Sequence, residues 1–374
     1  MKIIINKKAL LESLNKLAAF MKKEDQVIIS AKKANLYLFG RSIFSKISSE
    51  VKISVKDEAA GLKIDEPFSM KLDFLTLLKA VRQFSDEVIE LRPISNEVIR
   101  LALTSKEFEI SVSARYTEYN SGFTPGKQIG KFQSGRLDEL FKSIAYSVSE
   151  RLDRPLFNHV HFQLKDDELL VEATDSHRMA RYTDKTIIKN NFDLLIPQIV
   201  AKNISKYFGK AAWIKFEQRD EFIILKTTNA IIGWKALEEV YPDTNRLVPE
   251  RKDMIAYKFD LKSLEAALKR MLNLSDGSNY NSIVRLDFVR DRAQLNDGSL
   301  GFSLFGYHQE LKLLDECPAL TIGFNPLYII DAIKHLPKES KTVRLLITSN
   351  TRPLIVESEL ASNFLQLVTP IRMG

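Results

Sequence analysis

The sequence predicts an α+β protein made of three repeated domains, each with two helices packed on antiparallel sheets. The chain has 374 residues, and single cores stop growing near about 250 to 300 residues, so two or three domains are expected. An amphipathic helix pattern returns at a constant spacing, and short alternating strands follow each helix. The hydrophobic fraction of 45% and the charged fraction of 28% are typical of globular domains.

The pattern that opens each domain is a short apolar strand followed by an amphipathic helix. Residues 3–5 form the first such strand, and Leu10, Leu14 and Leu17 follow at helical spacing. The pattern returns after 127 residues and again after a further 127. The equivalent residues are Phe132, Leu137, Phe141 and Ile144, then Phe259, Leu264, Leu268 and Met271. This spacing predicts domains at 1–126, 127–252 and 253–374.

Each domain has a second half of the same kind. Strand-to-helix transitions are expected at 70–84, 194–208 and 321–336, with Pro197 and Pro326 early in their helices, where a missing donor is tolerated. Linkers are expected at 119–131 and 248–253. Alternating strands are predicted after these helices at 88–91, 98–103, 108–112, 213–216, 222–225, 231–234, 343–347, 354–356 and 364–368.

The cations lie on the predicted helices. Lys202, Lys206 and Lys210 recur every four residues and therefore project from one side of a helix. The net charge of +7 also favours a polyanionic partner. Lysines without aromatic residues between them favour sequence-independent, salt-sensitive phosphate contact, although an ordinary solvated helix face is the alternative. The cations predicted to contact such a polyanion are Lys23, Lys79, Arg82, Arg151, Arg154, Lys202, Lys206 and Lys210.

Several classes of protein are disfavoured by what the sequence lacks. Cys317 is the single cysteine, and five histidines hardly supply a zinc site. No apolar run has the ~20 residues that a membrane span needs, and no secretory h-region follows Met1. Phosphate-binding glycine motifs are absent as well. We therefore expect a cytoplasmic protein with no metal, cofactor or membrane partner.

Three groups of residues could carry chemistry, and each has a simpler interpretation. Asp175, Ser176 and His177 are the residue types of a hydrolase triad, but no G-x-S-x-G elbow surrounds the serine. His159 and His161 share one face of a predicted strand without an evident third metal ligand. The carboxylate pair at 166–167 fits a solvated turn. No catalytic residue is expected, and a Ser/His hydrolase is only a distant alternative.

Four stretches together resemble a known family. They are Ala-Thr-Asp-Ser-His-Arg-Met-Ala at 173–180, Tyr-Pro-Asp-Thr-Asn-Arg-Leu-Val-Pro at 241–249, Ile-Gly-Phe-Asn-Pro-Leu-Tyr at 322–328 and Leu-Val-Thr-Pro-Ile-Arg at 367–372. In this order they resemble the bacterial DNA polymerase III beta subunit, the replicative sliding clamp, and most of all its Gram-positive members. The resemblance spans the chain, but the first domain departs, because Gln-Val-Ile-Ile-Ser at 26–30 replaces a Pro-Ile-Leu run.

The resemblance implies three DNA-clamp domains that assemble as a head-to-tail homodimeric ring, with helices lining the hole and sheets forming the outer wall. Such a ring is a processivity factor in DNA replication, a non-catalytic, DNA-binding subunit that encircles duplex DNA. Its partners would be the catalytic subunit of the polymerase, the clamp loader and repair proteins that carry clamp-binding peptides. Relatives are usually acidic, so a clamp-like paralogue with a repair, mobile-element or regulatory role remains an alternative.

The resemblance also implies two sites. A pocket between the second and third domains would hold a short peptide rich in Gln, Leu and Phe. Its lining would be Phe157, Thr174, Ser176, His177, Arg178, Met179, Pro242, Arg246, Leu247, Pro353, Leu367, Thr369, Pro370, Ile371 and Arg372, with arginine and histidine as polar groups at the rim. The dimer interface would bring Phe108 of one subunit against Leu272 and Leu274 of the other, because an exposed phenylalanine on an edge strand favours pairing.

Overall fold

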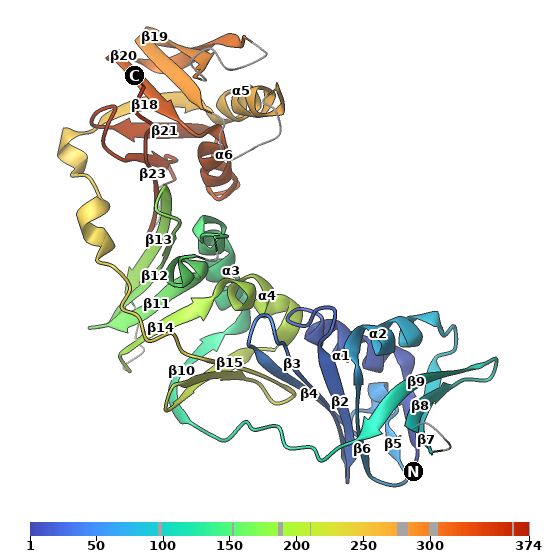
Figure 1. Cartoon of the computed structure of the whole chain (residues 1–374). Helices are drawn as coiled ribbons and strands as arrows, with labels where there is room; N and C mark the ends of the chain where they lie inside the picture. The colour runs from blue at the N-terminus through green and yellow to red at the C-terminus, as the bar shows by residue number, and fades with distance from the viewer. Residues whose placement is uncertain are drawn as a thin grey trace. The chain divides into compact units, whose positions relative to one another are not determined.

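The computed structural model describes residues 1–95, 99–151, 153–185, 190–209, 211–274, 283–298, 306–360 and 363–373. The chain forms two compact units, drawn with their elements in Figure 1. The first unit consists of Met1–Glu139 and Ile199–Glu238, and the second consists of Leu140–Gln198 and Glu239–Gly374. Within the described ranges, every helix is too short or too polar to cross a lipid bilayer.

The first unit is built on one large antiparallel sheet. Its strand order is β10-β15-β16-β17-β4-β3-β2-β6-β9-β8-β7-β1-β5. The elements that the first repeat contributes are β1 (Ile3–Asn6), α1 (Lys7–Leu17), β2 (Gln26–Lys32), β3 (Asn35–Arg41), β4 (Ser48–Ser54), β5 (Lys63–Ile64), β6 (Phe68–Asp73), α2 (Phe74–Gln83), β7 (Val88–Ser95), β8 (Ile99–Thr104) and β9 (Glu109–Tyr116). The elements from the second repeat are β10 (Lys127–Gln133), β15 (Trp213–Arg219), β16 (Phe222–Lys226) and β17 (Ala230–Lys235).

The second unit has an eight-stranded sheet in the order β14-β11-β12-β13-β23-β22-β21-β18, and β19 pairs with β20 separately. Two helices, α3 (Ser134–Ile144) and α4 (Gln198–Phe208), cross the unit boundary. The strands of this unit are β11 (His159–Lys165), β12 (Glu168–Thr174), β13 (Arg178–Lys185), β14 (Phe192–Pro197), β18 (Ile255–Asp260), β19 (Val284–Asp297), β20 (His308–Phe324), β21 (Thr342–Ile347), β22 (Leu354–Glu357) and β23 (Phe364–Val368). Its remaining helices are α5 (Leu261–Leu274) and α6 (Pro326–Lys334).

The helical repeat predicted from the sequence is confirmed. In α1, Leu10, Leu14 and Leu17 are fully buried. The equivalent residues of α3 and α5 are buried as well: Leu137, Phe141, Ile144, Leu264, Leu268 and Met271. Side-chain caps fix several helix starts, since Asn6 accepts a hydrogen bond from the Lys8 amide and Asn325 accepts one from the Leu327 amide.

Several predicted boundaries are wrong by a few residues. Pro197 ends β14 instead of lying inside α4, whereas Pro326 does occupy the first turn of α6. Phe108 precedes β9, because the turn there extends one residue further than the alternating apolar and polar residues of the predicted strand suggested. The linker expected at 119–131 ends earlier, since residue 127 already begins β10. The linker expected at 248–253 contains a short helical turn, Arg251–Asp253.

Consecutive repeats are joined by strand pairing of one type. In the first unit β17 pairs antiparallel with β4, with Ala230 opposite Val51. In the second unit β23 pairs antiparallel with β13, with Leu367 opposite Met179 (Figure 1). The loop between β12 and β13 therefore lies beside the segment that follows β23, and both segments carry residues of the predicted peptide pocket.

Candidate functional site

The turn between β12 and β13 presents the Thr-Asp-Ser-His-Arg motif. The Thr174 hydroxyl donates to the Arg178 carbonyl at 2.7 Å and accepts from the Ser176 amide at 3.1 Å. The Asp175 carboxylate accepts hydrogen bonds from the His177 and Arg178 amides, both at 2.9 Å. Ser176 has a φ of 78°, in the left-handed region that such a tight turn requires. The motif therefore builds a rigid turn with Ser176 and His177 exposed at its tip.

The C-terminal segment, residues 369–373, is fastened to this turn and to β20. The Thr369 amide donates to the His177 carbonyl at 2.8 Å, and the Thr369 hydroxyl donates to the same oxygen. The Ile371 amide donates to the Gly323 carbonyl at 2.7 Å. A Cβ on Gly323 would lie 2.4 Å from Met373 Sδ and 3.0 Å from the Ile371 carbonyl oxygen, so a side chain at this position would crowd the segment. Thr369 and Ile371 are half-buried, as wall residues of a groove would be.

A small apolar cluster separate from the main core lies beside the turn. Met179, Leu346, Ile355 and Leu367 are its buried members, and Val248 packs against them. Met179 and Leu367 are 2% and 4% exposed, so they are too buried to be the wall residues predicted for the pocket. Leu247, one residue before Val248, is 49% exposed, so its apolar side chain is accessible from solvent.

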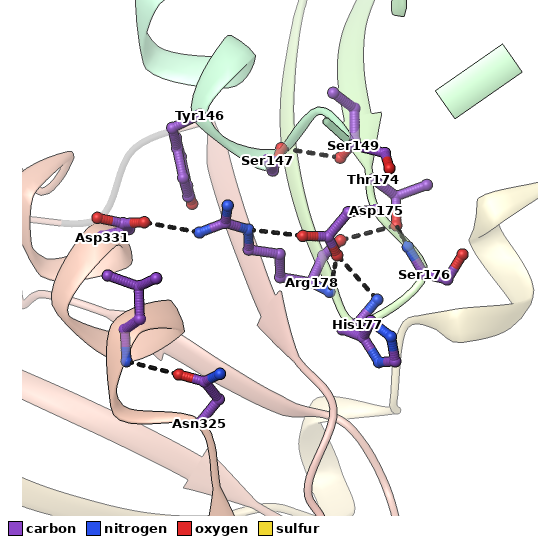
Figure 2. A network of polar contacts seen from close by, with 12 residues as sticks. Tyr146, Ser147, Ser149, Thr174, Asp175, Ser176, His177, Arg178, Asn325 and Asp331 are labelled. Carbon is purple, nitrogen blue, oxygen red and sulfur yellow. Dashed lines mark hydrogen bonds and ion pairs between the residues drawn. The ribbon is translucent and has the colours of Figure 1, made fainter. Parts of the chain in front are cut away.

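Arg178 has a different role from the polar rim position expected for it. Its side chain is only 11% exposed and bonds Asp175 at 2.9 Å and Asp331 of α6 at 2.7 Å, as Figure 2 shows. The guanidinium carbon also lies 5.5 Å from the centre of the Tyr146 ring and 4.8 Å from that of Tyr328. Burial alone would lower the pKa of Arg178, but the two carboxylates outweigh it and raise the pKa. Arg178 therefore joins the second and third repeats and positions the turn.

The other predicted pocket residues are placed as follows. Arg246 is exposed and lies 3.3 Å from Asp243, and Ser176 accepts a hydrogen bond from Arg154 at 3.3 Å. Phe157, Pro353 and Pro370 are half-buried, and Pro242 and Arg372 are exposed. These residues all belong to the second unit.

The hydrolase alternative has no geometric support. A triad needs a serine, a histidine and a carboxylate joined in sequence by hydrogen bonds. Asp175 is instead bonded to backbone amides and to Arg178, and the Ser176 hydroxyl is bonded to Arg154. The His177 ring lies 6.4 Å from that of Tyr328, centre to centre. Within the described residues, no group of three potential metal ligands is found either.

A buried network of charged residues, which the sequence alone did not reveal, holds the segment that carries Leu247. The Arg181 guanidinium donates to Glu172 at 2.9 Å and to Asn245 at 2.8 Å. The Thr244 hydroxyl donates to the same Glu172 carboxylate at 2.7 Å. His161 lies 3.0 Å from both Glu172 and Asp193, and its ring stacks on Tyr241. The network fixes residues 241–247 against β12 and β13, beside the apolar cluster.

His161 makes stability depend on pH. Burial alone would lower the pKa of His161, but hydrogen bonds to Asp193 and Glu172 outweigh it and raise the pKa from 6.5 to about 9. Protonation therefore stabilises the folded state, fully below pH 6.5 and progressively less as the pH rises through 9. The contribution is on the order of 3 kcal/mol.

We expect the free energy of unfolding of the native chain to exceed that of His161→Gln by the largest margin near pH 6 and by little near pH 10. Denaturant titrations of both proteins across this range measure the difference, and an NMR titration of the His161 ring should give a midpoint near 9. A ring that titrates near 6.5 would contradict the assignment.

The described members of the predicted DNA-contacting set are exposed: Lys79, Arg82, Lys202 and Lys206 lie on helices, whereas Lys23, Arg151 and Arg154 lie between elements. On α4, Lys202 and Lys206 are exposed, opposite a buried face that includes Ile204 and Tyr207. Lys210 lies outside the described residues. Lys23, Lys79 and Arg82 are exposed in the first unit. In the second unit Arg151 is exposed and pairs with Asp153 at 2.8 Å, and Arg154 is the partner of Ser176.

The predicted dimer residues fall on two surfaces. Phe108 is 37% exposed and stacks on Phe84, with ring centres 4.7 Å apart. Residues 109–113 of β9 pair with β8, whereas β6 pairs only with 114–116, so the first half of β9 is an open sheet edge within the described structure. At the end of α5, Leu274 is 44% exposed and Leu272 packs partly on the core.

Comparison with known proteins agrees with this geometry. Residues 131–243 match the model of the DNA polymerase III beta subunit central domain, and residues 245–372 match the model of its C-terminal domain. The beta sliding clamp of Streptococcus pneumoniae serotype 4 is 28% identical over 388 residues and 98% of each chain. The beta sliding clamp of Lactococcus lactis is 29% identical over 345 residues, 87% of this chain and 86% of the relative.

Solved structures agree with the fold as well. The Streptococcus pneumoniae DNA polymerase III beta chain matches with a TM-score of 0.88 at 26% identity over 99% of both chains. The Bacillus subtilis sliding clamp has a TM-score of 0.87 at 22% identity over both whole chains, which supports the fold. The fold and the repeated architecture thus place this chain in the class of sliding-clamp proteins. The chain belongs to the DNA polymerase III beta subunit family.

Proposed function

We propose that this protein is a DNA sliding clamp, a non-catalytic processivity factor of DNA replication. The observation that carries the proposal is end-to-end similarity to beta sliding clamps, over 98% of the chain, together with family models across residues 131–243 and 245–372. The finer parts of the proposal are three domains at 1–126, 127–252 and 253–374, a homodimeric ring and a cytoplasmic, nucleoid-associated location. Partners would be duplex DNA, the polymerase catalytic subunit, the clamp loader and repair proteins.

We assign the surface around Leu247 and the C-terminal segment to peptide binding. The apolar cluster beside it is already packed, the C-terminal segment is fixed by backbone hydrogen bonds to His177 and Gly323, and the Leu247 side chain is exposed. Binding to a site that is already formed costs less free energy, because fewer groups must be ordered. This geometry suits a leucine or phenylalanine anchor of a short partner peptide.

We assign duplex contact to the helix lysines, and this assignment tests the function. Lysines bind phosphate as point charges and read no sequence, which permits a ring to slide. Lys202→Glu combined with Lys206→Glu should shorten retention on nicked circular DNA without changing the mass of the assembly. For the native protein, log affinity should fall by roughly 0.9 per log unit of salt for each phosphate neutralised.

The control for this test is Lys63→Glu with Lys165→Glu, which makes the same charge change on two exposed strand lysines. If the helix double variant is retained as long as the native protein, the assignment is refuted.

A clamp-like paralogue with a repair, mobile-element or regulatory role remains the second candidate, because residues 26–30 depart from the family pattern. Rescue of a clamp-depleted host separates the two.

A further inference from the structure

A basic hollow in the first unit lies on segments that the proposed function leaves unassigned. It has a volume of about 610 Å³ and extends from the end of α1 to the strands β10, β15 and β16. Lys16, Lys131, Lys215 and Lys226 contribute its charged side chains, and the described lining contains no Asp or Glu. Four ammonium groups around one concavity create a local positive potential, which favours an anionic ligand.

Three of these four charges are uncompensated. Lys226 lies 2.6 Å from the buried carboxylate of Glu217 and is therefore neutralised. In the part of the chain that the structure describes, Lys16, Lys131 and Lys215 form no ion pair with a carboxylate. A ligand with two or three phosphates would supply the missing counter-charges.

An exposed tryptophan lies at the same place. Trp213 is 44% exposed, whereas Trp234, the only other tryptophan in the chain, is 3% exposed. The Lys131 ammonium lies 4.8 Å from the centre of the Trp213 ring. Indole rings usually bury most of their surface, so a half-exposed one among lysines indicates a contact surface.

The backbone around Trp213 holds the ring between two hollows. Trp213 is paired with Gln133 across β10 and β15, and the Ser134 amide donates to the Ala212 carbonyl at 3.1 Å. The ring also lines a second hollow of about 370 Å³, which includes Arg136 in the first turn of α3. Asp138 also lines that second hollow, and Arg136 pairs with Glu139 at 3.7 Å, so the cations without a carboxylate partner lie on the side of Lys131 and Lys215.

We propose that Trp213 and its lysines bind single-stranded nucleic acid, with a base stacked on the indole and phosphates at Lys16, Lys131 and Lys215. An aromatic platform flanked by cations is the usual means of binding single strands without sequence preference, because every base has a π face. An acidic peptide would satisfy the lysines but leave the indole without a partner. The proposal rests on the proposed role at DNA, and it adds a contact to unpaired strand that is distinct from duplex contact by α4.

The two tryptophans supply a direct measurement. In Trp234→Phe the emission comes from Trp213 alone, so titration of the full chain with a twelve-residue oligothymidylate should quench it. Trp213→Ala should weaken binding of the labelled oligonucleotide roughly tenfold or more, and Trp213→Phe should retain part of the affinity. Lys131→Glu with Lys215→Glu should weaken it to a similar degree and flatten the salt dependence, whose slope is about 0.7 per phosphate for single strands.

The controls separate this site from the rest of the protein. Lys63→Glu with Lys165→Glu should leave oligonucleotide binding unchanged, and Trp213→Ala should leave retention on circular duplex DNA unchanged. Unaltered oligonucleotide affinity in Trp213→Ala, or absence of quenching in Trp234→Phe, would overturn the proposal. Equal quenching of Trp213 by polyglutamate would also overturn it, in favour of an acidic protein partner. Retention of the α4 variants on circular duplex DNA tests the proposed function independently of this site.

Discussion

A chain that lacks residues 369–374 should lose its affinity for clamp-binding peptides and for polymerase while its assembly mass is unchanged. The deletion removes Thr369 and Ile371, whose amides hold the groove wall against His177 and Gly323. Short linear peptides of this kind should bind near micromolar affinity, or ~8 kcal/mol. The loss of one wall and of the contacts around an anchor side chain should therefore leave no measurable binding.

A point variant tests the same groove with less disturbance. Leu247→Asp places a charge where the proposed anchor would lie, and we expect peptide affinity to fall by about 2 kcal/mol or more. Leu314→Asp is the matched control, because Leu314 is 47% exposed and Leu247 is 49% exposed. Fluorescence anisotropy with a labelled Gln-Leu-Phe type peptide measures both variants. Unchanged affinity in the truncated chain would place the peptide site elsewhere.

The sequence predicted the repeated fold well because its signal is local. A helix that buries one face repeats its leucines at three and four residues, so Leu10, Leu137 and Leu264 could be aligned without a structure. Element ends were less accurate. Phe108 and Pro197 each stand one residue outside the element expected for them, because turn geometry there depends on tertiary contacts.

The site shows where sequence patterns stop being informative. Arg178 and Met179 are adjacent in the motif, yet the first bonds Asp331, 153 residues away, and the second is paired with Leu367 on the neighbouring strand β23. Their roles depend on which long-range partners the fold supplies, and no local period encodes that. The sequence contains a weak signal for Glu172 and Arg181, since charged residues on inward-facing strand positions need partners. That signal does not identify Thr244 and Asn245 as their partners.

The second large effect concerns assembly. Replacement of Leu272 and Leu274 by glutamate should convert a dimer of about twice 42.8 kDa into monomers. Two charges would be buried against Phe108 and the open edge of β9 in the partner subunit, without counter-ions, and such burial costs several kcal/mol per charge. Light scattering at micromolar concentration measures the mass directly.

Since Leu272 also packs partly on the core, the single variant Leu274→Glu, at a side chain that is 44% exposed, separates assembly from folding. It should weaken the dimer and leave the thermal unfolding of the subunit unchanged at high dilution. Val240→Glu is the control, because Val240 is 90% exposed and lies outside the proposed interface, so its dimer should persist. Phe108→Glu, on the opposing surface, should dissociate the dimer as Leu274→Glu does, because both residues are proposed to face one another across a single head-to-tail interface. A stable dimer in the Leu272 and Leu274 double variant would show that the subunits meet through other residues.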